Sequence, residues 1–294
     1  MSDFMSVEGV DETPEESVDK KLDTPSPKNA SNVGGENRYN IVDLPSNGNL
    51  NYPSSVNYRE MLFGDEKVLA SAADDTYLRT LNNVLKSILN DCEFYEDLSI
   101  HDRDYLLMWI FANNYNPYRD LQIECPSCGN VDEKRVDLTK LEVTPLTDDY
   151  VEPFKFTSEK GHELALRVIR VKDELKADKH VRTQIEKQIP SNKIDDIANV
   201  MQVCSIDVGQ AIELEQKLRW CEQNLTISDM RIIRRFHEYF SFGVNDVITH
   251  NCTSCDYELT GRVPFDTGDT FRTSVSDDFE DLLRSNQRAK DSAE

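Results

Sequence analysis

The sequence contains no run of about 18 apolar residues, which is the length that a helix needs to span a lipid bilayer. Its N-terminus also lacks a basic region followed by an apolar one, the pattern of a secretory signal peptide. We therefore expect neither a membrane span nor export through a signal peptide.

Positive charge is scarce, because 33 Lys and Arg residues stand against 55 Asp and Glu residues and give a net charge of −22. Nucleic acids and anionic membranes attract proteins through lysine and arginine, so neither is expected as the main partner. The one basic cluster consists of Arg231, Arg234 and Arg235, with Arg219 nearby. We favour a solvated helix face that pairs with some of the carboxylates, and contact with nucleic acid is the alternative.

Familiar catalytic motifs are also missing: the sequence has no HExxH, no GxSxG, and no GxxxxGK followed by Ser or Thr. Acidic pairs such as Asp74–Asp75 and Asp195–Asp196 stand where helices are expected to begin, and there they favour the helix dipole. The histidines are scattered without a partner motif, at His101, His162, His180, His237 and His250. An enzyme is therefore not expected.

Bulky apolar residues are almost missing from the first 37 residues, which carry nine carboxylates. Such a segment cannot bury enough surface to offset the entropy lost on ordering, so residues 1–38 are predicted to be a disordered acidic arm. The last thirty residues are polar as well. They predict a polar C-terminal tail over residues 265–294, with one short helix around residues 279–283.

Seven cysteines, an odd number in a chain without a secretory signal, do not indicate a disulfide framework. Cys92, Cys204 and Cys221 stand alone and are expected to be small buried apolar residues. The other four form two CxxC pairs, Cys125-Pro-Ser-Cys128-Gly129 and Cys252-Thr-Ser-Cys255-Asp256.

Each CxxC pair has the form of half a zinc site, because a two-residue spacer lets both thiolates of a tight turn point at one metal. Gly129 permits a positive φ after the second ligand, and Asp256 tolerates that geometry better than most residues. We expect Cys125, Cys128, Cys252 and Cys255 to share one structural zinc, since four thiolates leave no open position for catalysis. The alternatives are reduced bystanders, separate metals or a redox dithiol, with His250 either a replacement ligand or a neighbour of the ligands.

Helical patterns precede the first CxxC pair, with one short helix near Val68 and Leu69, a second opened by Asp74 and Asp75, and a third over residues 99–113. Ser99 and Asp102 resemble a capping box at the start of the third helix. Strands are expected at 121–123 and 131–138 around the first CxxC pair and at 154–156 and 164–171 after it.

The stretch from 173 to 240 has a helical pattern throughout, with starts expected at Asp173, Ser191, Gly209 and Ser228. Extended chain then returns around the second CxxC pair. The predicted fold is α+β, with an N-terminal helical region at 39–117 and a split zinc ribbon at 118–264. The ribbon is built from 118–138 and 244–264, and a strand-plus-helical region at 150–243 is inserted within it.

Several segments together resemble the baseplate hub assembly proteins of T4-like contractile-tailed phages, the T4 baseplate protein family. The resemblance rests on Leu44-Pro-Ser-Asn-Gly48 with Tyr52, then Asp104-Tyr-Leu-Leu107, Tyr115-Asn-Pro-Tyr118, the first CxxC pair, Val136-Asp-Leu138, Phe242-Gly243, the second CxxC pair and Val263-Pro-Phe265. It covers roughly residues 39–265. The acidic arm is extra to the family pattern, and the second CxxC pair lacks the glycine that follows the first.

The resemblance implies a non-enzymatic role in building the central hub of a phage tail baseplate, through contact with tail or baseplate hub proteins. The alternative function is a zinc-ribbon regulator that binds nucleic acid. The place of action would be the host cytoplasm during assembly, or the baseplate of the virion tail. The acidic surface would suit a chaperone that shields a sticky partner such as a tape measure protein or a hub subunit.

Overall fold

The computed structural model of the chain describes residues 39–73, 75–114, 116–187, 197, 200–207 and 213–263. Several predictions lie outside the described residues: the acidic arm, the polar tail with its short helix, the acidic pair 195–196, and the helix starts at Asp74, Ser191 and Gly209.

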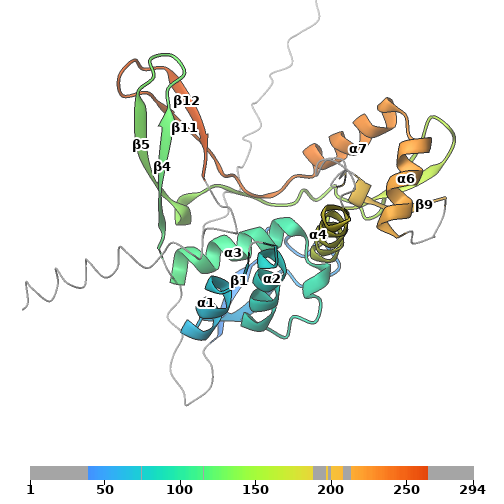
Figure 1. The fold of residues 1–294 in the computed structure, drawn as a ribbon, viewed down its shortest axis with the longest axis horizontal. Helices are drawn as coiled ribbons and strands as arrows, with labels where there is room; N and C mark the ends of the chain where they lie inside the picture. The colour runs from blue at the N-terminus through green and yellow to red at the C-terminus, as the bar shows by residue number, and fades with distance from the viewer. Residues whose placement is uncertain are drawn as a thin grey trace, which may run out of the picture. The chain divides into compact units, whose positions relative to one another are not determined.

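The first part of the described chain combines a small antiparallel sheet with three helices (Figure 1). Its strands run in the order β1 (Tyr39–Asp43), β2 (Ser55–Arg59) and β3 (Leu89–Asn90). Its helices are α1 (Phe63–Ala70), α2 (Tyr77–Ile88) and α3 (Ile100–Asn114), with a 3-10 turn at Tyr95–Asp97. Leucines, isoleucines and aromatic side chains of these elements form the largest core cluster, which is where apolar spacings of three and four residues place them.

One of the two hydrogen bonds of the predicted capping box is present at the start of α3. The Ser99 hydroxyl accepts the Asp102 N–H at 3.0 Å. The reciprocal bond of a capping box is replaced, because the Ser99 N–H donates to the Tyr52 hydroxyl and not to the Asp102 carboxylate. That carboxylate accepts the Ser46 N–H from the turn between β1 and β2.

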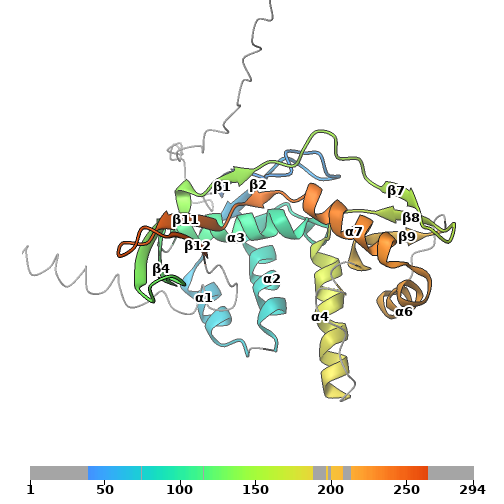
Figure 2. The same ribbon diagram turned by 90° about the horizontal axis from the view of Figure 1, so that it is seen from above.

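Two hairpins carry the CxxC pairs at their tips (Figures 1 and 2). The first consists of β4 (Tyr118–Glu124) and β5 (Val131–Asp137), and the second of β11 (Val247–Asn251) and β12 (Glu258–Arg262). Both are antiparallel, with Glu124 paired to Val131 in one and Asn251 paired to Glu258 in the other. The strands expected around both CxxC pairs are therefore confirmed.

A short antiparallel pair joins the chain that leaves the first hairpin to the chain that approaches the second. It consists of β6 (Val143–Thr144), which follows a 3-10 turn at Leu138–Lys140, and β10 (Gly243–Val244). Asn245 adds a backbone bond to the Glu142 carbonyl at 2.8 Å. The chain between these two strands therefore starts and ends at neighbouring points.

That intervening chain contains a three-stranded sheet and three described helices. The sheet order is β7 (Phe154–Thr157), β8 (Glu163–Leu166) and β9 (Val203–Ile206). The helices are α4 (Val171–Glu186), α6 (Leu214–Asn224) and α7 (Ile227–Tyr239). A second, smaller core cluster lies here, around Ile169, Ile197 and Leu218.

Three expectations for this region were wrong. The alternating stretch does not continue as a strand to Val171, because β8 ends at Leu166 and the Asp173 carboxylate caps α4 by accepting the Arg170 N–H at 3.0 Å. The helical interpretation of 173–240 missed β9, which gains its hydrogen bonds from β8 and not from its own segment. Helix α7 is capped by Thr226 and not by Ser228.

The described residues therefore form a mixed helix-and-sheet fold with several small sheets, as expected for the α+β class. Within this part of the chain, no helix combines the length and the apolar character that a bilayer span requires.

Candidate metal centre

The four predicted cysteine ligands lie together, with all four Sγ atoms within 4.8 Å of one another. Two close pairs cross between the hairpins: the Sγ atoms of Cys125 and Cys255 are 3.6 Å apart, and those of Cys128 and Cys252 are 3.7 Å apart. A disulfide would bring two sulfurs to about 2.0 Å, so these thiols are not bonded to one another. Sulfurs at about 2.3 Å from a tetrahedral zinc lie about 3.8 Å apart, close to both cross-hairpin distances.

Both CxxC turns have the same backbone hydrogen bonds. The Cys125 N–H donates to the Asn130 carbonyl at 2.7 Å, and the Gly129 N–H donates to the Cys125 carbonyl at 2.9 Å. In the second turn the Cys252 N–H donates to Tyr257 at 2.8 Å, and the Asp256 N–H donates to Cys252 at 3.0 Å. The two turns are therefore near copies of each other.

Asp256 takes the place that glycine holds in the first turn. Gly129 has a φ of +74° and Asp256 a φ of +59°, so both residues are in the left-handed region. Aspartate tolerates this region because its short side chain can bond locally, and here the Asp256 carboxylate accepts the Asn251 side-chain N–H at 2.9 Å. The missing glycine therefore leaves the second turn with the geometry of the first.

The thiols also influence one another electrostatically. The Asn130 N–H lowers the pKa of the Cys128 thiol, but the neighbouring thiols of Cys255, Cys125 and Cys252 outweigh it and raise the pKa to about 12. Four thiols at this spacing ionise together only beside a cation, which is how a divalent metal acts in a thiolate site. Cys128 and Cys255 are exposed, while Cys125 and Cys252 are buried beneath them.

Beside the thiols, only a small apolar cluster joins the tips of the two hairpins. Cys125, Cys252 and Leu259 form the buried cluster, with Ile123 packed against it. Gly261 on β12 lies directly against the Ile123 side chain, since an added Cβ atom would lie 2.5 Å from Ile123 Cδ1. Three residues are a small core, so this cluster alone would stabilise the pair of hairpins only weakly.

A buried carboxylate connects the two hairpins beside the thiols. Asp132 on β5 is 4% exposed, and it accepts the Thr253 N–H at 3.0 Å and the Thr253 hydroxyl at 2.5 Å. Asn130 also donates to it at 2.6 Å, and His250 Nε2 lies 3.5 Å away. The Thr253 hydroxyl, followed by its N–H, lowers the pKa of Asp132. His250 thus contacts the carboxylate that holds the second turn and stands outside the thiol cluster.

The lone cysteines and the basic cluster lie outside the thiol cluster. The lone cysteines Cys92 and Cys221 are buried as expected, whereas Cys204 is only half-buried and donates to the Ala165 carbonyl at 3.3 Å. Of the basic cluster, Arg219 and Arg235 form ion pairs with Glu215 and Glu238, at 2.5 Å and 3.4 Å.

The motif Leu44-Pro-Ser-Asn-Gly48 also has a structural role. Asn47 and Gly48 both have positive φ values, of 50° and 77°, which close the turn between β1 and β2. This turn is fixed to α3, because the Ser46 N–H donates to Asp102 at 3.0 Å and the Tyr52 hydroxyl donates to the other carboxylate oxygen. Tyr52 also accepts the Ser99 N–H at 3.1 Å.

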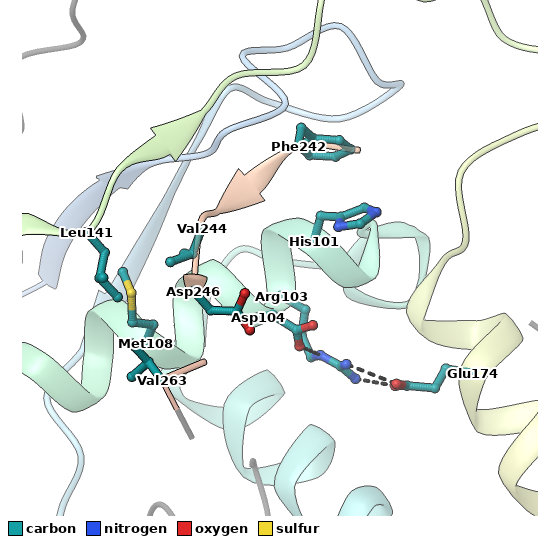
Figure 3. A pocket seen from close by; sticks show the side chains of 10 residues that line it. All are labelled: His101, Arg103, Asp104, Met108, Leu141, Glu174, Phe242, Val244, Asp246 and Val263. Carbon is teal, nitrogen blue, oxygen red and sulfur yellow. Dashed lines mark hydrogen bonds and ion pairs between the residues drawn. The ribbon is translucent and has the colours of Figure 1, made fainter. Parts of the chain in front are cut away.

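A cavity of about 340 Å³ lies where α3, α4 and the chain around β10 meet (Figure 3). Arg103, which is 3% exposed, donates to both oxygens of Glu174 on α4 and to Asp104 at 2.8 Å. Burial, with the charges on His237 and Arg103, lowers the pKa of His101 from 6.5 to about 4, so this histidine is neutral near pH 7. The charged groups in the cavity are thus largely paired, and they fasten α3 to α4.

No sequence pattern indicates the roles of Asp132 and Arg103. Asp132 bonds Thr253 and Arg103 bonds Glu174, and both partners are far along the chain. Local sequence spacing does not indicate such pairs. Asp102 was recognised only as a helix cap.

Comparison with protein families matches residues 36–272 to the family described as T4 bacteriophage base plate protein. Comparisons with curated proteins and with solved structures found no match. The family match confirms the resemblance that the sequence motifs indicated, and it spans both CxxC pairs and all the described elements. The chain therefore belongs to the T4 bacteriophage base plate protein family.

Proposed function

We propose that the chain is a non-enzymatic component or assembly factor of the phage baseplate hub, and that it acts by binding other tail or baseplate proteins. Family membership carries this proposal and supports a structural or assembly role in the tail. The described surface agrees with a binding function, since it exposes large apolar side chains on α1 and α7.

The four thiols would hold one structural zinc, with Cys125, Cys128, Cys252 and Cys255 as its ligands. The cross-hairpin sulfur distances and the matching turns support this assignment. Four sulfur ligands complete the tetrahedral coordination of zinc, so the metal would have no open position and would only hold the two hairpins together. In this proposal residues 118–138 and 244–264 form a zinc ribbon.

The zinc would act where the inserted region, residues 150–243, joins the two hairpins. Cys128 and Cys252 are separated by 123 residues, and β6 and β10 pair where this chain leaves and returns. Zinc would therefore close a long loop through the ribbon and fix the base of residues 150–243. The arm at 1–38, the helical region at 39–117 and the tail at 265–294 complete the proposed organisation.

Replacing Asp132 by alanine is expected to weaken zinc binding about 10- to 100-fold, because the second turn loses the acceptor for the Thr253 hydroxyl and N–H. Competition with a chromophoric chelator measures this affinity. Glu133→Ala is the matched control, since Glu133 is the next residue on β5 and its carboxylate accepts a hydrogen bond from the Gln122 side chain of the same hairpin, at 3.3 Å. Equal zinc affinity in the two variants would show that Asp132 does not position the second turn.

The assembly function predicts that the chain, purified by an affinity tag from phage-infected cells, retains tail or baseplate proteins in defined ratios. It also predicts that deleting the gene abolishes complete tails, as seen by electron microscopy. Normal tails after deletion would refute the proposal.

Mass spectrometry of purified virions separates two forms of this proposal. A resident hub component would be found in the particle, and a chaperone that works in the host cytoplasm would be present only in infected cells. For a chaperone, the proposed client is a hub subunit or the tape measure protein.

A further inference from the structure

Helix α7 presents an exposed face whose charge is opposite to that of the chain. Residues Ile227, Arg231 and Arg234 follow one another at spacings of four and three, so they lie along one side of the helix, with Arg235 beside them. We call these four residues the arginine face. All four are exposed, and Ile227 is 74% exposed. Large apolar side chains border it, at Ile232 and Tyr239.

The opposite side of α7 is firmly held. Ile233 and Phe236 are buried, and the Phe236 ring packs against Phe154 and Phe240 at centroid distances of 5.5 Å and 5.1 Å. The buried Asp229 carboxylate accepts the Thr226 N–H at 2.8 Å and the Glu159 N–H at 3.0 Å. The arginine face is therefore displayed on a fixed helix.

The arginines of this face are poorly neutralised. Arg235 reaches Glu238 at 3.4 Å, but both side chains are largely exposed, and such a pair contributes little. Within the described ranges, Arg231 and Arg234 have no carboxylate partner. Arg219 on α6 shows the contrast, since it pairs with Glu215 at 2.5 Å. The favoured expectation of a surface paired with carboxylates thus holds for Arg219 and Arg235 and, among the described residues, not for Arg231 and Arg234.

We propose that the arginine face is a docking surface for an acidic, partly apolar helix or segment of a partner protein. The inference rests on the proposed assembly function and adds to it the site and the chemistry of one partner. Carboxylates of the partner would face Arg231 and Arg234, and its apolar side chains would cover Ile227 and Ile232. Arginine suits this role because its guanidinium binds carboxylates through two parallel hydrogen bonds.

Charge complementarity favours a protein over nucleic acid. Three arginines offer few phosphate contacts, and a net charge of −22 repels a polyanion as it approaches. An isoleucine exposed among the arginines also fits an amphipathic protein segment better than a phosphate backbone.

The test uses the full-length chain and a fluorescein-labelled synthetic helix with leucine and glutamate on one side. Wild type is expected to bind this probe in a salt-sensitive way, and a copy with glutamine in place of glutamate is expected to bind more weakly. The double variant Arg231→Glu, Arg234→Glu should lose affinity about tenfold or more, since two attractive contacts become repulsive. The milder double variant Arg231→Gln, Arg234→Gln should lose less affinity, because it removes the two positive charges without adding negative ones.

The matched control is Arg79→Glu, Arg219→Glu, which changes the net charge equally at exposed positions on α2 and α6. It should stay within about twofold of wild type, because neither residue belongs to the arginine face and exposed charges away from the contact are partly screened. Circular dichroism confirms the fold of each variant. Equal losses in both charge-reversal variants would overturn the proposal, and so would tight binding of duplex DNA that depends on Arg231 and Arg234.

Capture from infected cells separates this inference from the proposed function. If wild type retains no tail protein, the assembly function fails. If wild type and Arg231→Glu, Arg234→Glu retain the same tail proteins equally, the function stands and the arginine face is not the docking surface.

Discussion

The variant Cys252→Ser is expected to lose its zinc and to unfold the paired hairpins β4–β5 and β11–β12. The three-residue cluster beside the thiols would hold the hairpin tips together only weakly, whereas structural zinc contributes about 10 kcal/mol or more to the folding of small zinc domains. Zinc content and amide hydrogen exchange measure the two effects. Protection should fall in β11 and β12, with smaller losses in α2 and α3, which belong to the large core.

The matched control is Cys204→Ser, which changes a half-buried cysteine that lies on β9 and outside the thiol cluster. It should keep one zinc and normal protection of both hairpins. A chelator added to wild type should reproduce the Cys252→Ser exchange pattern, since the exposed sulfurs of Cys128 and Cys255 leave the site accessible. Full protection of the hairpins in Cys252→Ser would show that no metal fastens them.

The variant Asp102→Ala is expected to lose about 3 to 4 kcal/mol of unfolding free energy, because two buried donors lose their acceptor at once. These are the Ser46 N–H and the Tyr52 hydroxyl, and the Asp102 side chain has no exposed surface through which water could replace it. Chemical denaturation at neutral pH measures the change. The turn at Ser46 should also lose its protection from hydrogen exchange.

Two further variants test whether Asp102 and Tyr52 act together. Asp102→Asn keeps the size of the side chain and one acceptor, so it should cost about half as much. Tyr52→Phe combined with Asp102→Ala should cost clearly less than the sum of the single changes, because both remove the same hydrogen bond. Additive losses, or a loss below about 1 kcal/mol in Asp102→Ala, would contradict the role assigned to this carboxylate.

The closeness of the cysteines within each CxxC turn was predictable because its signal is local. A two-residue spacer brings Cys125 close to Cys128 and Cys252 close to Cys255 whatever the rest of the chain does. The alternating flanks of both turns also predicted the hairpins correctly. The sequence indicated only that Asp256 can tolerate a left-handed backbone conformation. The structure shows that its carboxylate accepts a hydrogen bond from Asn251 in this conformation.

The features that escaped prediction depend on distant partners. Strand β9 lies in a helical pattern and becomes a strand because β8 offers it an edge. Asp132 meets Thr253 only after the hairpins are side by side, and Asp102 meets Ser46 only after the first turn packs on α3. Whether Arg231 and Arg234 meet a carboxylate likewise depends on the folded chain, and among the described residues they meet none.

Zinc X-ray absorption spectroscopy of the purified full-length chain tests whether one zinc joins the two hairpins. We expect one zinc per chain with four sulfur neighbours at about 2.3 Å. A chain that folds without metal would contradict this expectation. So would a zinc whose neighbours include nitrogen at about 2.0 Å, because His250 would then replace one of the four thiolates.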